Sequence, residues 1–163
     1  MKEIILTKGK VAIVDDDDFL NINSKSWYAY KEGNTYYAAR DDRSNQKRKR
    51  VLMHREILNT PYDLITDHKD RNGLNNIRSN IRICTKVENN RNTKLRNDST
   101  SGIKGVSFKK REKKWAAQIS FNKKIKWLGY FNTAKEAMSA YDNASILLHG
   151  DFASPNMGKV AFG

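Results

Sequence analysis

The chain has 163 residues, and its 31 Lys and Arg against 18 Asp and Glu give a formal net charge of +13, far more than solubility requires. Such an excess favours a polyanionic partner, although charge alone does not distinguish DNA, RNA and a membrane surface. No apolar run approaches the roughly 18 residues of a membrane span and the apolar start is too short for a signal peptide, so we expect an intracellular, non-secreted protein without a membrane partner. The single cysteine, Cys84, excludes an internal disulfide and a zinc site built on paired cysteines.

Residues 1–50 predict a small β-rich N-terminal segment that ends in a basic arm. Strand-like runs at 3–7, 11–14, 27–30 and 35–40 are separated by glycine-containing turns. The acidic run at 15–18 lacks the spacing and the closing Glu of an EF-hand, so we interpret it as a solvated turn or a helix start. No function for residues 1–40 follows from the sequence.

The basic arm ends with Arg48, Lys49 and Arg50. A solvated surface is the ordinary interpretation of such a charge run. Its position beside the stretch described next favours phosphate contacts by these three residues, from a loop or the edge of a strand.

Residues 51–96 predict a strand, a long Asn-rich loop, a second strand and a helix, preceded by a short element that contains His54. The two strands are the short apolar runs at 64–66 and 81–84, each bounded by turn residues. Thr85 stands three residues ahead of Glu88, which is the pattern of a helix start. We interpret His54 as structural.

This order brings Asp67 and His68, at the end of the first strand, towards Asn89 in the first turns of the helix. A carboxylate and an amide oxygen are hard ligands that suit magnesium or manganese. The imidazole, with an unperturbed pKa near 6.5, can take a proton from water. Because neighbours in a regular strand point to opposite faces, such a site requires the strand to end at this pair.

The stretch resembles the HNH endonuclease motif, the ββα-metal nuclease fold common in phage and intron-encoded homing endonucleases. The matching residues are Leu52-Met53-His54-Arg55, Asp67-His68-Lys69-Asp70, Asn75-Asn76, Asn80-Ile81-Arg82 and Glu88-Asn89-Asn90. The resemblance implies that His68 is the general base, that Asp67 and Asn89 are the metal ligands, and that Asn80 holds the loop and orients the histidine. The family uses Asn as well as His at the position of Asn89, so this residue does not indicate an inactive copy.

A polar linker at 97–101 separates this region from a second module at 102–154, which a tail at 155–163 follows. Strand-like runs at 105–108, 115–121 and 125–131 precede a helix that begins with the box Thr133-Ala134-Lys135-Glu136. A three-stranded antiparallel sheet packed on one helix leaves one sheet face uncovered, and a sheet of this kind can enter the DNA major groove. Trp115 shares the parity of Ala117 and Ile119, which predicts a core position.

The second module resembles the plant ethylene-response-factor (APETALA-type) DNA-binding domain, which also occurs fused to HNH nucleases in phages. The matching residues are Lys104-Gly105-Val106, Trp115-Ala116-Ala117-Gln118-Ile119, Trp127-Leu128-Gly129-Tyr130-Phe131, Ala134-Lys135-Glu136-Ala137 and Ala140-Tyr141-Asp142. The resemblance implies DNA contacts at Lys104, Gln118, Ser120 and Trp127. Lys104, Ser107 and Ser120 stand where the plant domains carry Arg, so guanine recognition is weakened and the plant target does not transfer.

Four further lysines are candidate phosphate contacts or solvate the sheet edge: Lys109, Lys110, Lys124 and Lys126.

The sequence as a whole predicts an α+β protein with an N-terminal β segment, a ββα-metal core and a C-terminal sheet on one helix. The expected function is a magnesium-dependent endonuclease acting on double-stranded DNA, with manganese as an alternative and without zinc; if phage-encoded, it acts in the host cytoplasm. A monomer would nick, whereas a double-strand break needs a dimer or two successive events. The alternative is a non-catalytic, sequence-specific DNA-binding regulator that retains the HNH scaffold.

Overall fold

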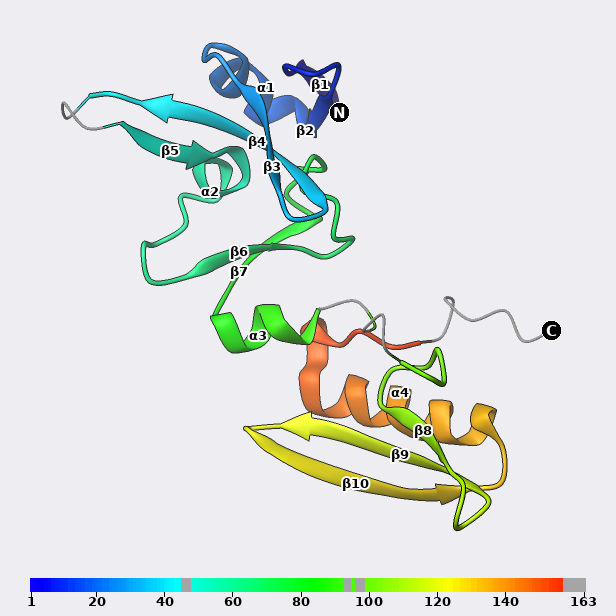
Figure 1. Cartoon of the computed structure of the whole chain (residues 1–163). Coiled ribbons are helices and arrows are strands. Elements are labelled where there is room, and N and C mark those ends of the chain that lie inside the picture. The colour runs from blue at the N-terminus through cyan, green and yellow to red at the C-terminus, as the bar shows by residue number, and fades with distance from the viewer. Residues whose placement is uncertain (45–47, 93–94, 96–98, 157–163) are drawn as a thin grey trace. The chain divides into compact units, whose positions relative to one another are not determined.

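The computed structural model describes residues 1–44, 48–92, 95 and 99–156, and it divides into two compact units, Met1–Asn89 and Asn90–Gly163 (Figure 1). Part of the predicted linker, residues 97 and 98, and most of the predicted tail, 157–163, lie outside the described residues. The predicted boundary between 96 and 97 lies seven residues beyond the division at Asn89 (96 − 89). Each unit is described by itself.

The first unit begins with a hairpin and a helix. Strand β1 (Lys2–Ile5) pairs antiparallel with β2 (Val11–Val14), and helix α1 (Asp16–Asn23) follows. The acidic run thus occupies the first turn of a helix, where negative charge complements the helix dipole. Asp18 also forms an ion pair with Arg78, at 2.7 Å, which ties α1 to the Asn-rich loop.

A three-stranded antiparallel sheet comes next, in the order β3 (Tyr28–Glu32), β4 (Thr35–Asp42) and β5 (Lys49–Leu52). The short helix α2 (Met53–Ile57) follows directly. Lys49 and Arg50 of the predicted basic arm therefore lie on an edge strand.

The ββα order predicted from the sequence is present as β6 (Ile65–His68), its antiparallel partner β7 (Ile81–Cys84) and helix α3 (Lys86–Arg91). One buried core joins this part to the N-terminal strands, so the predicted segment 1–50 packs in one unit with residues 51–89 of the predicted segment 51–96. The buried core residues are Ile4, Leu6, Ala12, Val14, Ile22, Trp27, Ala29, Ala38, Met53, Ile57 and Ile81.

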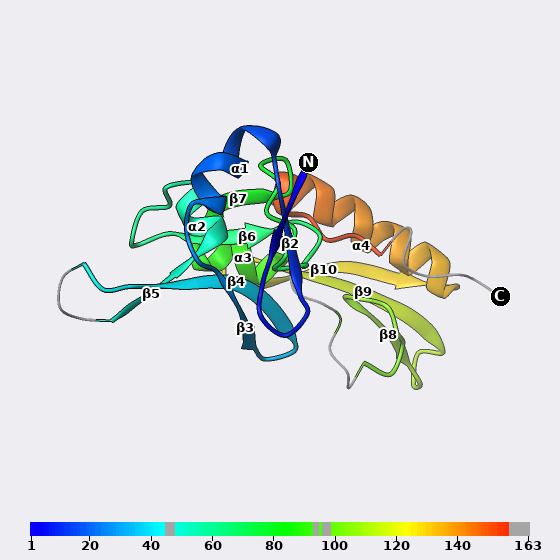
Figure 2. The ribbon, with the colours of Figure 1, turned by 90° about the horizontal axis from the view of Figure 1, so that it is seen from above.

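The second unit has strands β8 (Val106–Lys109), β9 (Lys114–Phe121) and β10 (Lys124–Phe131), with β9 in the middle, followed by α4 (Ala134–His149) and the 3-10 turn η1 (Gly150–Phe152). Figures 1 and 2 show α4 running along one face of this sheet. The predicted capping box is formed by Thr133 and Glu136. The α+β fold class is therefore confirmed.

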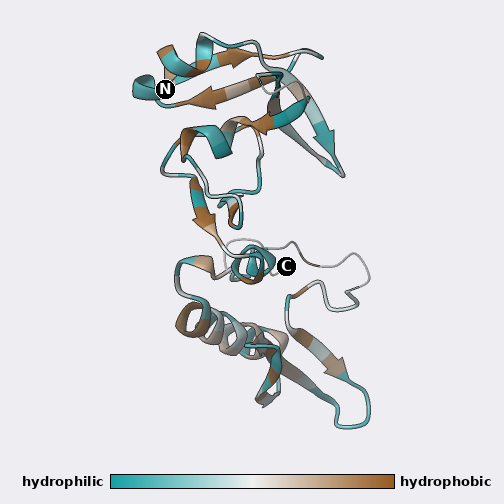
Figure 3. Ribbon diagram, turned by 90° about the vertical axis from the view of Figure 1, so that its left-hand side faces the viewer, coloured by the Kyte–Doolittle hydropathy of each residue, from teal (hydrophilic) through white to brown (hydrophobic). Residues whose placement is uncertain are grey.

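Hydrophobic and hydrophilic residues alternate along the ribbons of both units (Figure 3). In the second unit the apolar set forms a core between sheet and helix that includes Ile119, Ala137, Met138 and Tyr141. Among the described residues no helix is both long and apolar enough to cross a bilayer.

Candidate functional site

Asp67 and His68 are both buried, with 7% and 5% of their surface exposed, and both belong to β6. Strand β6 ends at His68, as the sequence interpretation required, but both residues of the pair are still bonded into the ladder with β7. Asp67 lies opposite Arg82 and His68 lies opposite Ile81, and directly paired residues share a sheet face. The two side chains therefore lie on opposite faces of the hairpin in this register.

The carboxylate of Asp67 accepts two hydrogen bonds from Arg82 at the same oxygen, Oδ2: 2.9 Å from Nε and 2.6 Å from Nη2. This is a largely buried ion pair, and its guanidinium partner is only 13% exposed. Arg82 is among the residues of the HNH resemblance, but the sequence assigned it no role; strand pairing places it directly across from Asp67.

The imidazole of His68 is oriented by Asn76, which is fully buried. Its Nε2 lies 3.1 Å from Asn76 Oδ1, while the amide nitrogen of Asn76 donates to the carbonyl of Leu74 (3.3 Å) and to Met53 Sδ (3.5 Å). Because the amide nitrogen is committed to acceptors, Oδ1 faces the imidazole and Nε2 is the donor. This arrangement assigns the basic lone pair of His68 to Nδ1.

Asn80, expected to hold the loop and orient the histidine, makes its contacts within the loop. Its amide nitrogen donates to Asp70 Oδ1 (3.0 Å) and to the carbonyl of Asn75 (2.7 Å), and its Oδ1 accepts from the Asp70 backbone N–H (3.1 Å). Its contacts are those of loop support, whereas the direct contact to His68 comes from Asn76. Asn76 is among the residues of the HNH resemblance, but no role was assigned to it from the sequence.

Two further rings surround His68. The ring centroid of His54 lies 4.8 Å away in an edge-on arrangement, and that of Tyr37 lies 5.9 Å away. Burial lowers the pKa of His54 to about 3, and the nearby His68 and Arg55 act in the same direction. Burial also lowers the pKa of His68, against the opposing effects of the Asn76 hydrogen bond and the charges of Asp70 and Asp67. Both imidazoles are therefore neutral at pH 7, as proton acceptance by His68 requires.

Asn89, the third predicted site residue, is half-buried in α3. The helix start is fixed as predicted: the Glu88 carboxylate accepts from the Thr85 backbone N–H (2.8 Å), and the Glu88 N–H donates to Thr85 Oγ1 (3.3 Å). Burial, followed by the charge of Asp67, raises the pKa of the Cys84 thiol to about 11, while a hydrogen bond from the Asn89 backbone acts in the opposite direction. Asp67 and Asn89 thus both influence the pKa of the Cys84 thiol, in opposite directions.

The structure, within the residues it describes, contains no group of three His, Cys, Asp or Glu side chains able to hold a metal. Asp67 offers a carboxylate and Asn89 a side-chain amide, and both are hard oxygen ligands of the kind that magnesium prefers. The protonated Cys84 thiol offers no soft thiolate that would favour zinc.

In the second unit, strand pairing defines an open face of the sheet, which we take as the face opposite α4. Gln118 pairs with Trp127 and Ser120 pairs with Ile125, and all four side chains are exposed. Trp127 is 48% exposed and its ring lies 4.9 Å from that of Tyr130 in a T-shaped arrangement. The register thus places three of the expected contact residues, Gln118, Ser120 and Trp127, on one open surface.

The predicted lysines fall in different places. Lys109 lies at the end of the open face, and Lys110 lies in the turn after β8. Lys124 pairs with Phe121 and Lys126 pairs with Ile119, so these two lie on the face that α4 covers. Because side chains alternate with a period of two along β10, these two lysines do not share the open face with Trp127, and their phosphate contacts stay a prediction.

Lys104 precedes β8, and its Nζ donates to the backbone carbonyl of Arg91 (3.0 Å). Trp115 packs against the core, as predicted, with its ring 5.3 Å from Phe108.

The arm residues of the first unit are all exposed. Arg48 forms an ion pair with Asp41 at 2.8 Å, and the guanidinium of Arg50 lies 3.8 Å from the centroid of the Tyr30 ring. Lys49 lies between them on the edge strand β5.

Comparison with known proteins finds similarity to different families in the two parts of the chain. The AP2 domain model matches residues 101–150, which contain the three-stranded sheet and α4. Residues 101–150 are an AP2 domain. The AP2 domain ends at Gly150, where α4 ends, so its bounds differ by one to four residues from the predicted module at 102–154.

The whole chain is similar to an uncharacterised HNH endonuclease of Acanthamoeba polyphaga mimivirus, with 29% identity over 156 residues that cover 95% of this chain and 78% of that protein. An ethylene-responsive transcription factor of Arabidopsis thaliana is 35% identical over 103 residues, 60% of this chain and 62% of the factor. Protein 3.8 of Escherichia phage T7 is 35% identical over 60 residues, 37% of this chain and 50% of that protein. No solved structure is a significant match. The chain thus combines an AP2 domain with similarity to an HNH endonuclease.

Proposed function

We propose that this protein is a DNA-binding nuclease, and more specifically a metal-dependent HNH endonuclease that hydrolyses phosphodiester bonds of double-stranded DNA. Two similarities support the coarser statement: the near full-length similarity to an HNH endonuclease and the AP2 domain shared with transcription factors. The observation that carries the catalytic proposal is the buried, neutral His68, whose tautomer is set by Asn76.

In the proposed reaction, Nδ1 of His68 takes a proton from a water molecule, and the resulting hydroxide attacks the phosphorus in line with the leaving 3′ oxygen. The P–O3′ bond breaks, the leaving 3′ oxygen takes a proton from solvent and His68 returns its proton to solvent, which leaves a 5′ phosphate and a 3′ hydroxyl. Asp67 and Asn89 would hold a divalent cation, magnesium or manganese, which supplies charge stabilisation for the phosphate and the leaving oxygen. Asn76 keeps the proton on Nε2 throughout, so that Nδ1 remains the accepting atom.

The AP2 domain would position the duplex. Its open face presents Gln118, Ser120 and Trp127, and Lys109 with Lys114 places positive charge at one end of that face. Phosphate contacts from Arg48, Lys49 and Arg50 would add sequence-independent affinity.

The alternative function, a DNA-binding regulator without catalysis, is favoured by one observation: Asp67, the expected metal ligand, is paired with Arg82. In this case the ion pair would be a permanent structural element of the hairpin rather than one that opens when a metal binds.

The deciding experiment is incubation of supercoiled plasmid with the wild-type chain and the His68→Ala variant, each with magnesium and with EDTA. His149→Ala is the matched control, because His149 lies at the end of α4 in the AP2 domain. We expect nicked or linear plasmid with wild type and His149→Ala in magnesium, and a loss of cleavage by orders of magnitude for His68→Ala with DNA affinity retained. Gel shifts without cleavage in every metal would leave the regulator as the function.

A further inference from the structure

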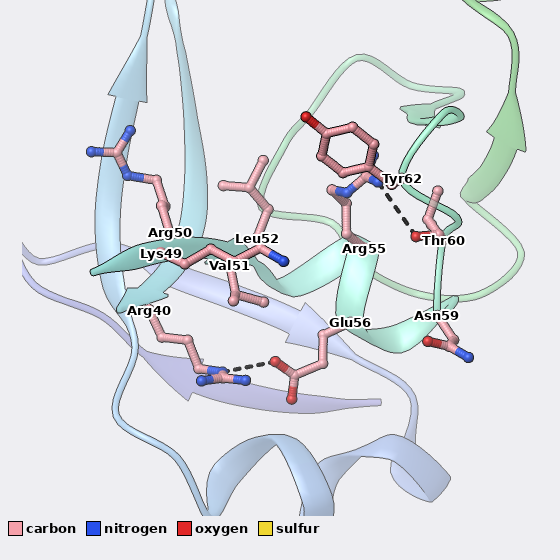
Figure 4. Close-up of a pocket in the computed structure, with 10 residues that line it drawn as sticks. All are labelled: Arg40, Lys49, Arg50, Val51, Leu52, Arg55, Glu56, Asn59, Thr60 and Tyr62. Carbon is pink, nitrogen blue, oxygen red and sulfur yellow. Dashed lines mark hydrogen bonds and ion pairs between the residues drawn. The ribbon is translucent and has the colours of Figure 1, made fainter. Parts of the chain in front are cut away.

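A groove in the first unit is separate from the residues of the proposed catalytic site. It has a volume of about 760 Å³ and is lined by residues of β4, β5, α2 and the loop after α2 (Figure 4). Lys49 and Arg50 lie on one side of it, and Arg55 and Tyr62 on the other. Neither Asp67, His68 nor Asn89 lines it.

The groove carries unbalanced positive charge. Glu56 is the one carboxylate in the lining, and it is used by two cations: Arg40 Nε donates to Oε2 at 2.7 Å, and Lys25 pairs with Oε1. Lys49, Arg50 and Arg55 therefore have no carboxylate partner within the lining. An anion is the ligand that such a surface favours.

Arg55 is held in place before any ligand arrives. Its Nη1 donates to the carbonyl of Leu64 (2.8 Å), and its Nη2 donates to the carbonyls of Pro61 (2.9 Å) and Thr60 (3.4 Å). These acceptors are neutral, so the positive charge remains. A guanidinium that is already ordered loses little side-chain entropy on binding an anion.

Tyr62, which follows Pro61 in the same loop, is 95% exposed. A large aromatic side chain with nearly all of its surface in water gains free energy when a flat apolar group stacks on it. Beside a row of cations, the ligand that offers both a charged backbone and flat faces is a nucleic-acid strand with unstacked bases. Bases inside an intact duplex do not present their faces.

We propose that this groove binds a locally unpaired strand of DNA, with phosphates on Lys49, Arg50 and Arg55 and one base stacked on Tyr62. The proposal deepens the proposed function, because it names DNA with an unpaired segment as the preferred substrate of the nuclease. It rests on that function only for the choice of DNA over RNA.

The test is fluorescence anisotropy of the full chain with labelled oligothymidylate of 20 nucleotides and with an abasic oligomer of equal length and charge. Tyr62→Ala removes the stacking ring, and Tyr62→Phe restores it. Leu20→Ala is the control, since Leu20 is an apolar side chain of α1 in the same unit that is 81% exposed and does not line the groove. Both substituted positions are at the surface, so these variants are expected to fold.

We expect Tyr62→Ala to weaken binding of oligothymidylate by about fivefold or more. The abasic oligomer should bind wild type and Tyr62→Ala equally, and Tyr62→Phe and Leu20→Ala should behave as wild type. The double variant Lys49→Gln and Arg50→Gln should weaken binding of both oligomers and reduce the slope of log affinity against log salt by about 1.4.

Equal affinity of wild type and Tyr62→Ala for oligothymidylate would overturn the proposal, as would an equal loss in Leu20→Ala. Tighter binding of oligouridylate than oligothymidylate would overturn the choice of DNA. Binding and plasmid cleavage are separate measurements, so the two proposals can fail independently. If the protein cleaves plasmid but Tyr62→Ala binds oligothymidylate as wild type does, the endonuclease function stands and the groove proposal is wrong. If the protein cleaves nothing but Tyr62→Ala weakens binding, the groove proposal stands and the endonuclease function is wrong.

Discussion

Lowering the pH from 7 to 5 should destabilise the first unit, because the folded protein resists protonation of His54. The side chain is only 4% exposed, its Nδ1 has no hydrogen-bond partner, and burial lowers its pKa from 6.5 to about 3. The unfolded chain therefore binds more protons than the folded one between pH 6.5 and 3. The stabilising contribution is complete above pH 6.5 and is lost as the pH falls towards 3.

The size of the effect follows from the linkage relation, in which one proton changes the free energy of unfolding by about 1.36 kcal/mol per pH unit. Over the roughly 1.5 units between the unfolded pKa and pH 5, His54 contributes a loss of about 2 kcal/mol. His68, whose pKa is also lowered by burial, adds to the loss in the same direction. Replacing His54 by Gln removes the first contribution and leaves the second.

The assay is urea unfolding at pH 7 and pH 5, in EDTA, of wild type and His54→Gln. Trp27 is the one tryptophan of the first unit, and its indole N–H donates to the carbonyl of Ile22 at 2.8 Å, so its indole resonance reports on this unit alone. We expect wild type to lose about 2 kcal/mol more than the variant on acidification. His149→Gln, in the AP2 domain, should leave the pH response of this signal unchanged.

Two results would refute the reasoning. The first is an equal loss of the free energy of unfolding by wild type and His54→Gln between pH 7 and 5. The second is a titration of the His54 ring C2–H resonance with a midpoint near 6.5. Either would mean that water or a proton reaches this imidazole in the folded state.

Two other substitutions test the site and the AP2 domain. Asn76→Ala should slow plasmid cleavage by about tenfold or more at unchanged DNA affinity, because His68 loses the partner that sets its tautomer; an unchanged single-turnover rate would exclude this role. Gly105→Ala should lower the free energy of unfolding of the second unit by about 3 kcal/mol or more. Its φ is +74°, and a Cβ there would overlap the Tyr141 ring and lie 2.7 Å from the Gln118 carbonyl oxygen. A melting temperature within one degree of wild type, read from the indole resonances of Trp115 and Trp127, would contradict the second expectation.

Much of the local structure could be predicted from the sequence because it depends on short-range chemistry. The Thr85–Glu88 and Thr133–Glu136 boxes begin helices where expected, since their hydrogen bonds join residues three apart. The alternation along β9 placed Trp115 in the core and Gln118 on the open face, because side chains in a strand alternate. The acidic run at 15–18 similarly became the first turn of α1.

The domain boundaries and the surroundings of His68 depended on contacts between distant parts of the chain. His68 contacts Asn76, Tyr37 and His54 only because β4, α2 and the Asn-rich loop pack together. No spacing in the sequence predicts those contacts. The same packing merges the first two predicted segments into one unit.

The sequence by itself therefore determined the order strand, strand, helix around His68, the order of three strands and a helix in the AP2 domain, and the choice of Asp67, His68 and Asn89 as candidates, because these rest on local patterns. The tertiary structure decided which asparagine contacts the histidine, that Asp67 is paired with Arg82, and on which face of β10 each lysine lies. Those outcomes depend on strand register and on burial, which are set by the packing of the whole unit and not by neighbouring residues.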